Sequence, residues 1–238
     1  IIEFNSSVFS SMLLNWGADF KVYDIVPDKY DLIKNAALKA AEECDIVLIN
    51  AGSSAGRDDY TSSVIRELGE VLFHGISIKP GKPAILGVIR NKPVIGIPGY
   101  PVSGIIIMEQ IVKRVIEFYQ CSTFHARQKI KASLSRKIVS SLKYKEFIRV
   151  KLGDVSGKLI ATPLTSGSGV ITSFVKADGL LVIPQNIEGY ENGSIVDVEL
   201  LKSIDDIKNT LVVTGSHDPL IDEVSDILRK DDFHYHIA

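Results

Sequence analysis

The 238-residue sequence lacks most features that would assign a protein to a class at once. Its two cysteines, Cys44 and Cys121, lie far apart and fit no metal-ligand spacing, which favours reduced thiols in a cytoplasmic protein. Neither sign of charge dominates: 27 Lys and Arg face 29 Asp and Glu, and a net charge of −2 gives no reason to expect nucleic acid or an acidic membrane surface as a partner. The apolar runs are too short to span a bilayer, and no signal peptide opens the sequence.

What the sequence contains is ordinary for a globular protein, with 45% apolar and 24% charged residues. Helical spacing covers residues 6–16 and 30–43, with Asn5 or a serine available as a cap. Residues 20–26 (FKVYDIV) alternate like a strand, and residues 45–50 (DIVLIN) are continuously apolar, like a strand covered on both faces. This rhythm predicts an α/β domain with a mostly parallel sheet.

The following elements complete that domain. AILGVIR and PVIGIPG read as two strands joined by a tight turn at Asn91-Lys92. Residues 102–119 read as a long helix with one apolar face. We therefore place an α/β domain at residues 1–124, and we expect its N-terminal strand to be missing because the chain enters directly into a helix.

The pattern changes near residue 125. Short alternating segments, among them FIRVKL and SGVITSFVKADGLLVIP, are separated by Gly, Asn, Asp and Pro and predict a small all-β barrel or sandwich over 125–206. Residues 207–238 combine one strand with the start of a helix, which is too little to bury a core. We expect this last segment to be the truncated start of a third domain.

The loop after DIVLIN is the first candidate site. In an open α/β sheet, ligands bind beyond the carboxyl ends of the strands, and the sequence AGSSAGRDDY leads the chain to that edge. Glycines let a backbone approach a ligand closely, and serines add hydroxyl groups suited to a phosphate or a pterin-like ring. An ordinary turn between strand and helix would explain the loop equally well. The residues concerned are Gly52, Ser53, Ser54 and Gly56.

Carboxylates follow at the far end of the same loop. Asp58, Asp59 and Thr61 all stand at a helix start, where one of them would satisfy capping, so the excess points to Mg²⁺ or a substrate. Asp28, in the turn after the preceding predicted strand, would reach the same edge of the sheet. An ordinary turn aspartate is an equally good interpretation of Asp28.

Two further motifs suit an anion. Lys79 and Lys82 bracket a Pro-Gly turn, and two ammonium groups held close together favour a phosphate or an oxyanion such as molybdate between them. GIPGYPVSG places two prolines and a glycine directly before a helix, which is either an anion-receiving helix start or simple helix-start chemistry. Its candidate binding residues are Pro98, Gly99, Pro101 and Ser103.

In this order and spacing, AGSSAGRDDYT, IKPGKP and GIPGYPVS resemble the molybdopterin molybdenumtransferases, the MoeA/gephyrin E-type proteins of molybdenum cofactor synthesis. FIRVKL, ADGLLVIP and GSIVDVEL are similar to that family's C-terminal barrel, so the resemblance covers about residues 1 to 205. It implies a three-layer αβα molybdopterin-binding domain with a mostly parallel sheet, followed by a small all-β barrel domain. The stub GSHDPLIDEVSDIL resembles the opening of a periplasmic-binding-protein-like domain.

The resemblance also implies a reaction. Members bind adenylylated molybdopterin, insert molybdate and release AMP in a Mg²⁺-dependent step. By matching motifs, Asp59 falls on the family's essential aspartate and Asp28 on the acid one strand earlier, and both would hold the cation. Lys79 and Lys82 fall on the two lysines that would receive molybdate or phosphate, while the AGSSAG loop would cradle the pterin phosphate.

Two departures and two alternatives stand beside this interpretation. The family more often has Ser-Gly-Gly at Asn50-Ala51-Gly52 and asparagine at Tyr100, and its members carry further N-terminal domains that help form a homodimer. The full-length protein is therefore the expected enzyme, and this chain by itself is expected at least to bind. The alternatives are a molybdopterin adenylyltransferase, which is otherwise a possible partner enzyme, and a non-catalytic molybdopterin-binding scaffold. Molybdate and tungstate are not distinguished.

Overall fold

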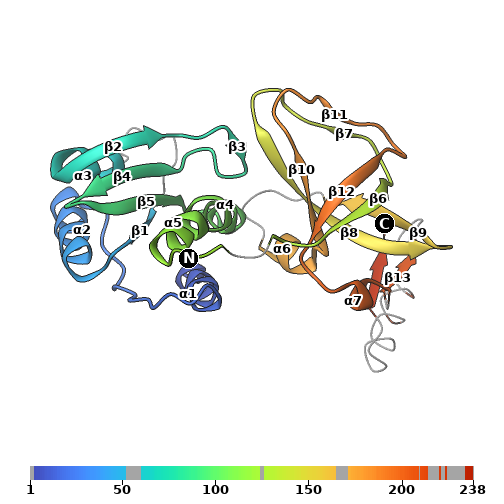
Figure 1. Cartoon of the computed structure of the whole chain (residues 1–238), viewed down its shortest axis with the longest axis horizontal. Coiled ribbons are helices and arrows are strands. Elements are labelled where there is room, and N and C mark those ends of the chain that lie inside the picture. Colours follow the sequence, from blue (N-terminus) through green and yellow to red (C-terminus); the bar gives the residue numbers. More distant parts are fainter. Residues whose placement is uncertain are drawn as a thin grey trace. The chain divides into compact units, whose positions relative to one another are not determined.

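A computed structural model describes residues 3–51, 60–123, 126–164, 171–208, 210–213, 220, 223 and 234–237. Figure 1 shows the helices and strands within these ranges. The contacts divide the chain into two compact units that meet in the sequence near residue 125. Each unit is described by itself below.

The first unit is built on a mixed sheet with the strand order β1-β5-β4-β2. β1 (Val47–Ala51) runs parallel to β5 (Lys92–Pro98), whereas β4 (Ile85–Ile89) runs antiparallel both to β5 and to β2 (Gly69–His74). Figure 1 shows β4 between β2 and β5. The prediction of a mostly parallel sheet is therefore wrong for the described strands. Among them, β1 and β5 form the one parallel pair, whereas β4 is antiparallel to both of its neighbours.

The hairpin between β4 and β5 was predicted, with its turn one residue too late. Ile89 pairs with Lys92, so the turn residues are Arg90 and Asn91. Both have positive φ angles, 49° and 60°, as a two-residue type I′ turn requires. Asparagine adopts this conformation readily, which is why its position marked the turn closely.

The helices of the first unit agree with their sequence patterns. α1 and α2 confirm the helices predicted at 6–16 and 30–43, and one long helical segment confirms that at 102–119. The long segment contains one π-helical stretch in its middle, which the sequence did not indicate. The bounds are α1 Asn5–Asn15, α2 Tyr30–Glu43, α3 Tyr60–Leu68, α4 Pro101–Ile107, π-helix η1 Met108–Val112 and α5 Lys113–Tyr119.

Small residues bring these helices close to one another and to the sheet. α2 presents alanines to a core that it shares with α3 and with β1, β4 and β5. α1 crosses α4 at Gly104, where an added Cβ would lie 2.6 Å from Phe9 Cζ. The shared core consists of Ala37, Ala40, Ala41, Val47, Val64, Ile65, Ile85, Ile89 and Val94.

Two strand assignments in the first unit differ from the sequence analysis. Residues 20–26, predicted as a strand, have no strand structure, and none of the described residues hydrogen-bonds their backbone. Conversely, the stretch TSSVIRELGE after the predicted helix start reads as helical to its end, but β2 begins within it, at Gly69. Gly69 pairs with Ile89 so closely that a Cβ would lie 1.9 Å from the Val88 carbonyl oxygen, so tertiary pairing ends the helix there.

The second unit contains the predicted small barrel. β8 pairs with β9, β9 with β6, β6 with β12, β12 with β10, and β10 with β8, which closes the ring. Closure leaves no strand edge within the ring unpaired. The strands are β6 Lys129–Leu134, β8 Lys145–Val155, β9 Lys158–Pro163, β10 Gly179–Ile183 and β12 Ile195–Leu200.

Shorter elements complete the second unit. The segment SGVITSFVKADGLLVIP was assigned to the all-β module, but its middle forms the helix α6 (Thr172–Lys176) before β10 begins. β7 (Ile138–Val139) pairs with β11 (Gly189–Tyr190), and α7 spans Ile204–Lys208. β13 (Thr210–Val213) pairs in parallel with β14 (His234–Ile237). Within the described ranges, no helix is long and apolar enough to cross a membrane.

Candidate functional site

The parallel pair β1 and β5 defines the edge of the sheet where a site would form. Asn50 lies opposite Ile97 and Ala51 opposite Pro98, so the two strands end side by side. The loops that follow them therefore leave the sheet next to each other, at the carboxyl ends of two neighbouring parallel strands. These are the AGSSAG loop and the Gly-Tyr-Pro segment of the sequence analysis.

The lysine turn reaches the same edge because β4 is antiparallel. Ile85, the first residue of β4, pairs with Gly96 near the end of β5. Lys79 ends the short strand β3 (Ile78–Lys79), and Lys82 lies in the turn that joins β3 to β4. The lysine turn and the Gly-Tyr-Pro segment thus lie at the edge of the sheet where β1 also ends.

Gly81 fixes the shape of the lysine turn. Its φ is 120°, and a Cβ there would lie 3.0 Å from Cδ1 of Ile107 and 3.2 Å from Cδ1 of Ile78. The turn is closed by the backbone N–H of Ile76, which donates to the carbonyl oxygen of Lys82 at 2.8 Å. Both lysine side chains are exposed, so the turn presents them to solvent from a backbone packed against α4.

The side chain of Asn5 joins the two loop starts. Its Nδ2 donates to the carbonyl oxygen of Gly99 at 3.0 Å and to Oδ1 of Asn50 at 3.3 Å, and the residue is buried. Sequence reasoning treated Asn5 only as a possible helix cap, but the structure makes Asn5 the first helical residue and uses its amide to hold β1 and β5 together at their ends. No sequence signal distinguished these two roles.

The Gly-Tyr-Pro segment leads into α4 as its sequence predicted. Pro101 occupies the first helical turn, and the N–H of Gly104 donates to the carbonyl oxygen of Tyr100 at 2.9 Å. Tyr100 is 63% exposed at this corner, whereas Ser103 is buried within the helix. Tyr100 therefore offers its side chain to a ligand more readily than Ser103 does.

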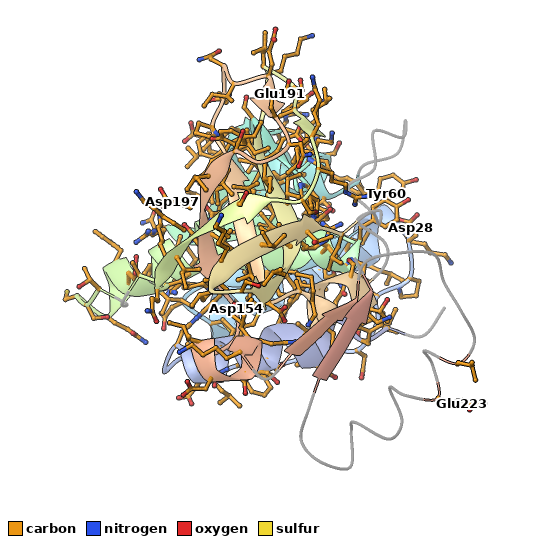
Figure 2. All side chains as sticks on the ribbon, turned by 90° about the vertical axis from the view of Figure 1, so that its right-hand side faces the viewer. Asp28, Tyr60, Asp154, Glu191, Asp197 and Glu223 are labelled. Atoms are coloured by element: carbon orange, nitrogen blue, oxygen red, sulfur yellow. The ribbon has the colours of Figure 1, made fainter. Side chains whose placement is uncertain are left out.

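Asp28 lies beside the start of α3. It lines a cavity of about 590 Å³ together with Asn50, Tyr60 and Thr61. Figure 2 shows Asp28 and Tyr60 on the same side of the molecule. Whether Asp28 and Asp59 reach one site stays a prediction. Asp59 itself, with Gly52, Ser53, Ser54 and Gly56, lies outside the described residues.

A cluster of side chains holds α2 against α3 near Asp28. The Tyr30 hydroxyl and the Lys34 ammonium group both donate to the Glu67 carboxylate, and the Tyr30 and Tyr60 rings meet edge to face with centroids 6.0 Å apart. The Lys34 hydrogen bond first, and the Tyr30 hydroxyl second, hold the pKa of Glu67 below its ordinary value. These contacts position the first turn of α3 relative to the turn that carries Asp28.

The second unit contains a buried charge cluster that sequence reasoning missed. The Asp178 carboxylate, 1% exposed, accepts hydrogen bonds from Lys151 Nζ at 2.8 Å and the Leu152 N–H at 2.9 Å, and Lys202 Nζ lies 2.9 Å from it. Burial lowers the pKa of Lys151 and also that of Arg149, two residues earlier on β8. The signal was present in FIRVKL, where two cations occupy one face of an otherwise apolar strand.

Family comparisons agree with both units. A model described as "Probable molybdopterin binding domain" matches residues 1–117, and one described as "MoeA C-terminal region (domain IV)" matches residues 131–201. The chain is 41% identical over 202 residues to a curated protein of Methanocaldococcus jannaschii named for molybdopterin biosynthesis, covering 85% of this chain and 48% of that protein. It is 24% identical over 200 residues to the molybdopterin molybdenumtransferase of Bacillus subtilis, covering 83% of this chain and 46% of that enzyme.

Solved structures give the same result. The molybdopterin biosynthesis MoeA protein of Pyrococcus horikoshii matches with a TM-score of 0.71 and 35% identity, over 85% of this chain and 49% of that one. A molybdenum cofactor biosynthesis protein of Pyrococcus furiosus matches with a TM-score of 0.66 and 32% identity, over 83% and 64%. The chain belongs to the MoeA family of molybdenum cofactor biosynthesis proteins. It spans about half the length of the curated relatives it matches.

Proposed function

We propose that the protein is a molybdopterin molybdenumtransferase: this chain binds adenylylated molybdopterin, and the full-length protein inserts molybdate and releases AMP. One observation carries the proposal. The ends of β1 and β5, tied together by Asn5, and the lysine turn before β4 all lie at one edge of the sheet. This edge combines backbone loops suited to phosphate with fixed positive charge, which is what a doubly anionic nucleotide-linked substrate requires.

Each motif at this edge has a distinct chemical role in the proposal. The loop that starts after Ala51 would receive the pterin phosphate on backbone N–H groups and on the hydroxyls of Ser53 and Ser54. The ammonium groups of Lys79 and Lys82 would bind molybdate or a phosphate, since both are tetrahedral anions. Pro98 and Pro101 would keep the second loop in one conformation, so little entropy is lost when a ligand binds.

We also propose that two acids of this chain hold a magnesium ion. Mg²⁺ in proteins is commonly held by one or two carboxylates together with waters and substrate phosphates. Asp28 lines the cavity together with Tyr60, which follows Asp59 in the sequence. Asp28 and Asp59 would therefore hold Mg²⁺, which when bound would neutralise charge on the substrate phosphates.

The same proposal includes the three-layer αβα arrangement for the first unit. Val94 of β5 belongs to the core shared with α2 and α3, whereas Cγ2 of Ile97 lies 3.4 Å from the position of a Cβ on Gly104 of α4. Successive residues of a strand point to opposite faces, so residues three apart in β5 face different sides of the sheet. This alternation supports helices on both faces.

Titration calorimetry of adenylylated molybdopterin in the presence of Mg²⁺ tests the proposal. We expect micromolar binding by the chain, weakened about tenfold, or ~1.4 kcal/mol, by Lys79→Ala and by Asp59→Asn. The matched control is Lys39→Ala, because Lys39 is an exposed lysine on α2 and does not line the cavity beside Asp28. This control should bind as the unaltered chain does.

Activity separates binding from turnover. The full-length protein should release AMP from adenylylated molybdopterin only when molybdate is added, and Lys82→Ala should reduce that release. ATP-dependent adenylylation of molybdopterin would instead identify an adenylyltransferase. Binding by the full-length protein with no AMP release would identify a scaffold. Absence of binding by both the chain and the full-length protein would overturn the proposed site.

A further inference from the structure

Tyr100 places a large exposed side chain at the candidate edge of the first sheet. It follows Pro98 and Gly99 at the end of β5 and directly precedes α4, and it is 63% exposed. Among the residues that the structure describes, none forms a hydrogen bond, an ion pair or a ring contact with the Tyr100 side chain. Its ring is therefore available to a ligand.

The backbone of Tyr100 is fixed on both sides. A residue before a proline is confined to extended conformations, and Tyr100, directly before Pro101, has a φ of −68° and a ψ of 126°. Its carbonyl oxygen accepts a hydrogen bond from the N–H of Gly104 at 2.9 Å, and the carbonyl oxygen of Gly99 accepts one from Asn5 Nδ2 at 3.0 Å. A tyrosine ring on a fixed backbone loses little entropy when it packs against a ligand.

Tyr100 stands between the two places where the proposed function binds anions. The strand order β1-β5-β4 puts β5 in the middle, as Figure 1 shows. The residues that follow β5 are therefore flanked by the end of β1 on one side and by the lysine turn before β4 on the other. Neighbouring strands lie about 4.8 Å apart, so β1 and β4 are separated by about 10 Å. A small ligand that reaches both flanks passes Tyr100.

The chemistry of the proposed substrate indicates which of its parts lies there. In molybdopterin, one ring of a nearly flat fused system carries both the phosphate and the sulfurs that take up the metal. The proposed function binds the phosphate after β1 and molybdate at Lys79 and Lys82. The ring that connects these groups then lies between the two flanks, beside Tyr100. The adenosine is attached beyond the phosphate and therefore lies farther from the lysines.

We propose that Tyr100 is a binding residue that stacks on the fused pterin ring system of the substrate, an inference that rests on the function proposed above. A flat heteroaromatic ring stacks on an aromatic side chain whatever its polar substituents are. Asparagine, which the family more often has at this position, offers an amide group but no ring face. Tyr100 thus makes this chain favour ligands that carry the ring system over ligands that carry only its phosphate.

Titration calorimetry with substituted chains tests the stacking. Tyr100→Ala and Tyr100→Asn should each weaken binding of adenylylated molybdopterin about tenfold, whereas Tyr100→Phe should keep the affinity because it keeps the ring. Binding of inorganic phosphate should not change in any of them. The matched control is Tyr119→Ala. Tyr119 is also an exposed tyrosine, but it lies within electrostatic reach of Lys92, which begins β5 at the opposite edge of the sheet.

Pterin fluorescence gives a readout that a purely structural role of Tyr100 would not change. The probe is 6-hydroxymethylpterin phosphate. A tyrosine ring stacked on an excited pterin quenches its emission by donating an electron, and a phenylalanine ring does not. At equal saturation, the bound probe should therefore emit less with the unaltered chain than with Tyr100→Phe. Equal emission from these two complexes would contradict the stacking.

The outcomes separate this inference from the proposed function. If Lys79→Ala weakens binding of adenylylated molybdopterin but Tyr100→Ala does not, the proposed function stands and the stacking is overturned. If Tyr100→Ala weakens binding of AMP but not of 6-hydroxymethylpterin phosphate, the stacked ring is adenine and the assignment to the pterin is wrong. Absence of binding of adenylylated molybdopterin by the chain and by the full-length protein would overturn both.

Discussion

Removing the Asp178 carboxylate is the sharpest test of how the barrel is held together. Asp178 stands just before β10, and its two carboxylate oxygens join β8 to the segment after β12 through Lys151, Leu152 and Lys202. The backbone of Asp178 makes further links, since its N–H donates to Val150 and its carbonyl oxygen accepts from the N–H of Leu201 at 2.8 Å. Asp178→Ala keeps these backbone bonds and removes only the charge and its hydrogen bonds.

The expected loss of stability follows from the groups that stay buried without a partner in Asp178→Ala. The Lys151 side chain is 9% exposed, so its ammonium group would stay buried without its counter-charge, and the Leu152 N–H would lose its acceptor. Breaking a buried ion pair by removing one partner costs about 3–5 kcal/mol. Lys202, whose side chain is 34% exposed, can turn to solvent and adds little. We expect Asp178→Ala to lower the stability of the second unit by about 3–5 kcal/mol.

Urea unfolding followed by two signals measures this loss. Far-UV circular dichroism follows both units, whereas fluorescence of Trp16, the one tryptophan of the sequence, reports on the first unit, where it is buried. Asp178→Asn should also destabilise, because it keeps an acceptor for Leu152 but leaves Lys151 uncompensated. Adding Lys151→Met to Asp178→Asn should restore part of the loss. A cost below about 1 kcal/mol for Asp178→Ala, or a double variant less stable than Asp178→Asn, would refute the reasoning.

Two further predictions concern the first unit. Gly81→Ala should cost about 1–3 kcal/mol and weaken anion binding, because Gly81 combines a φ of 120° with a Cβ position 3.0 Å from Ile107. Gly157→Ala, at a φ of 81° with open space around it, should cost less in the same urea unfolding experiment, and an equal cost would contradict the packing argument. Glu67→Gln should lower the melting temperature at pH 7. The difference in melting temperature should vanish as the pH falls below 4.5 through the depressed folded-state pKa of Glu67. The reason is that the Glu67 carboxylate stabilises the fold only while it is charged. A constant difference in melting temperature at every pH would contradict this prediction.

Elements whose stability is set locally could be predicted from the sequence. α2 has the predicted bounds, Tyr30–Glu43, because its alanines and charged residues recur with helical spacing. The β4–β5 hairpin was placed within one residue because Asn91 tolerates a positive φ. The barrel followed from alternating segments between turn residues. In each case the determining residues are neighbours in the chain.

Elements set by distant neighbours could not be predicted. β2 forms because Gly69 fits against Val88, and nothing in residues 60–70 reveals that partner. Residues 20–26 have the pattern of a strand but pair with no strand in the described part of the chain, since a strand needs a neighbour that these residues do not supply. The role of Asn5 belongs to the same class, because its amide bonds to residues 45 and 94 positions away.

The place of the lysine turn depends on a strand direction that the sequence did not reveal. By resemblance, the lysine turn and the loop after β1 are expected to bind one substrate, in a domain with a mostly parallel sheet. In a wholly parallel sheet, however, a turn that precedes a strand lies at the opposite, amino edge. Lys79 and Lys82 reach the candidate site only because β4 runs antiparallel to β5, which puts its first residue, Ile85, next to the end of β5. The type I′ turn at Arg90-Asn91 sets that direction. Arg90 and Asn91 reverse the chain at the edge of the sheet opposite the candidate site. They therefore determine whether the two lysines and the loop after β1 can act on one ligand.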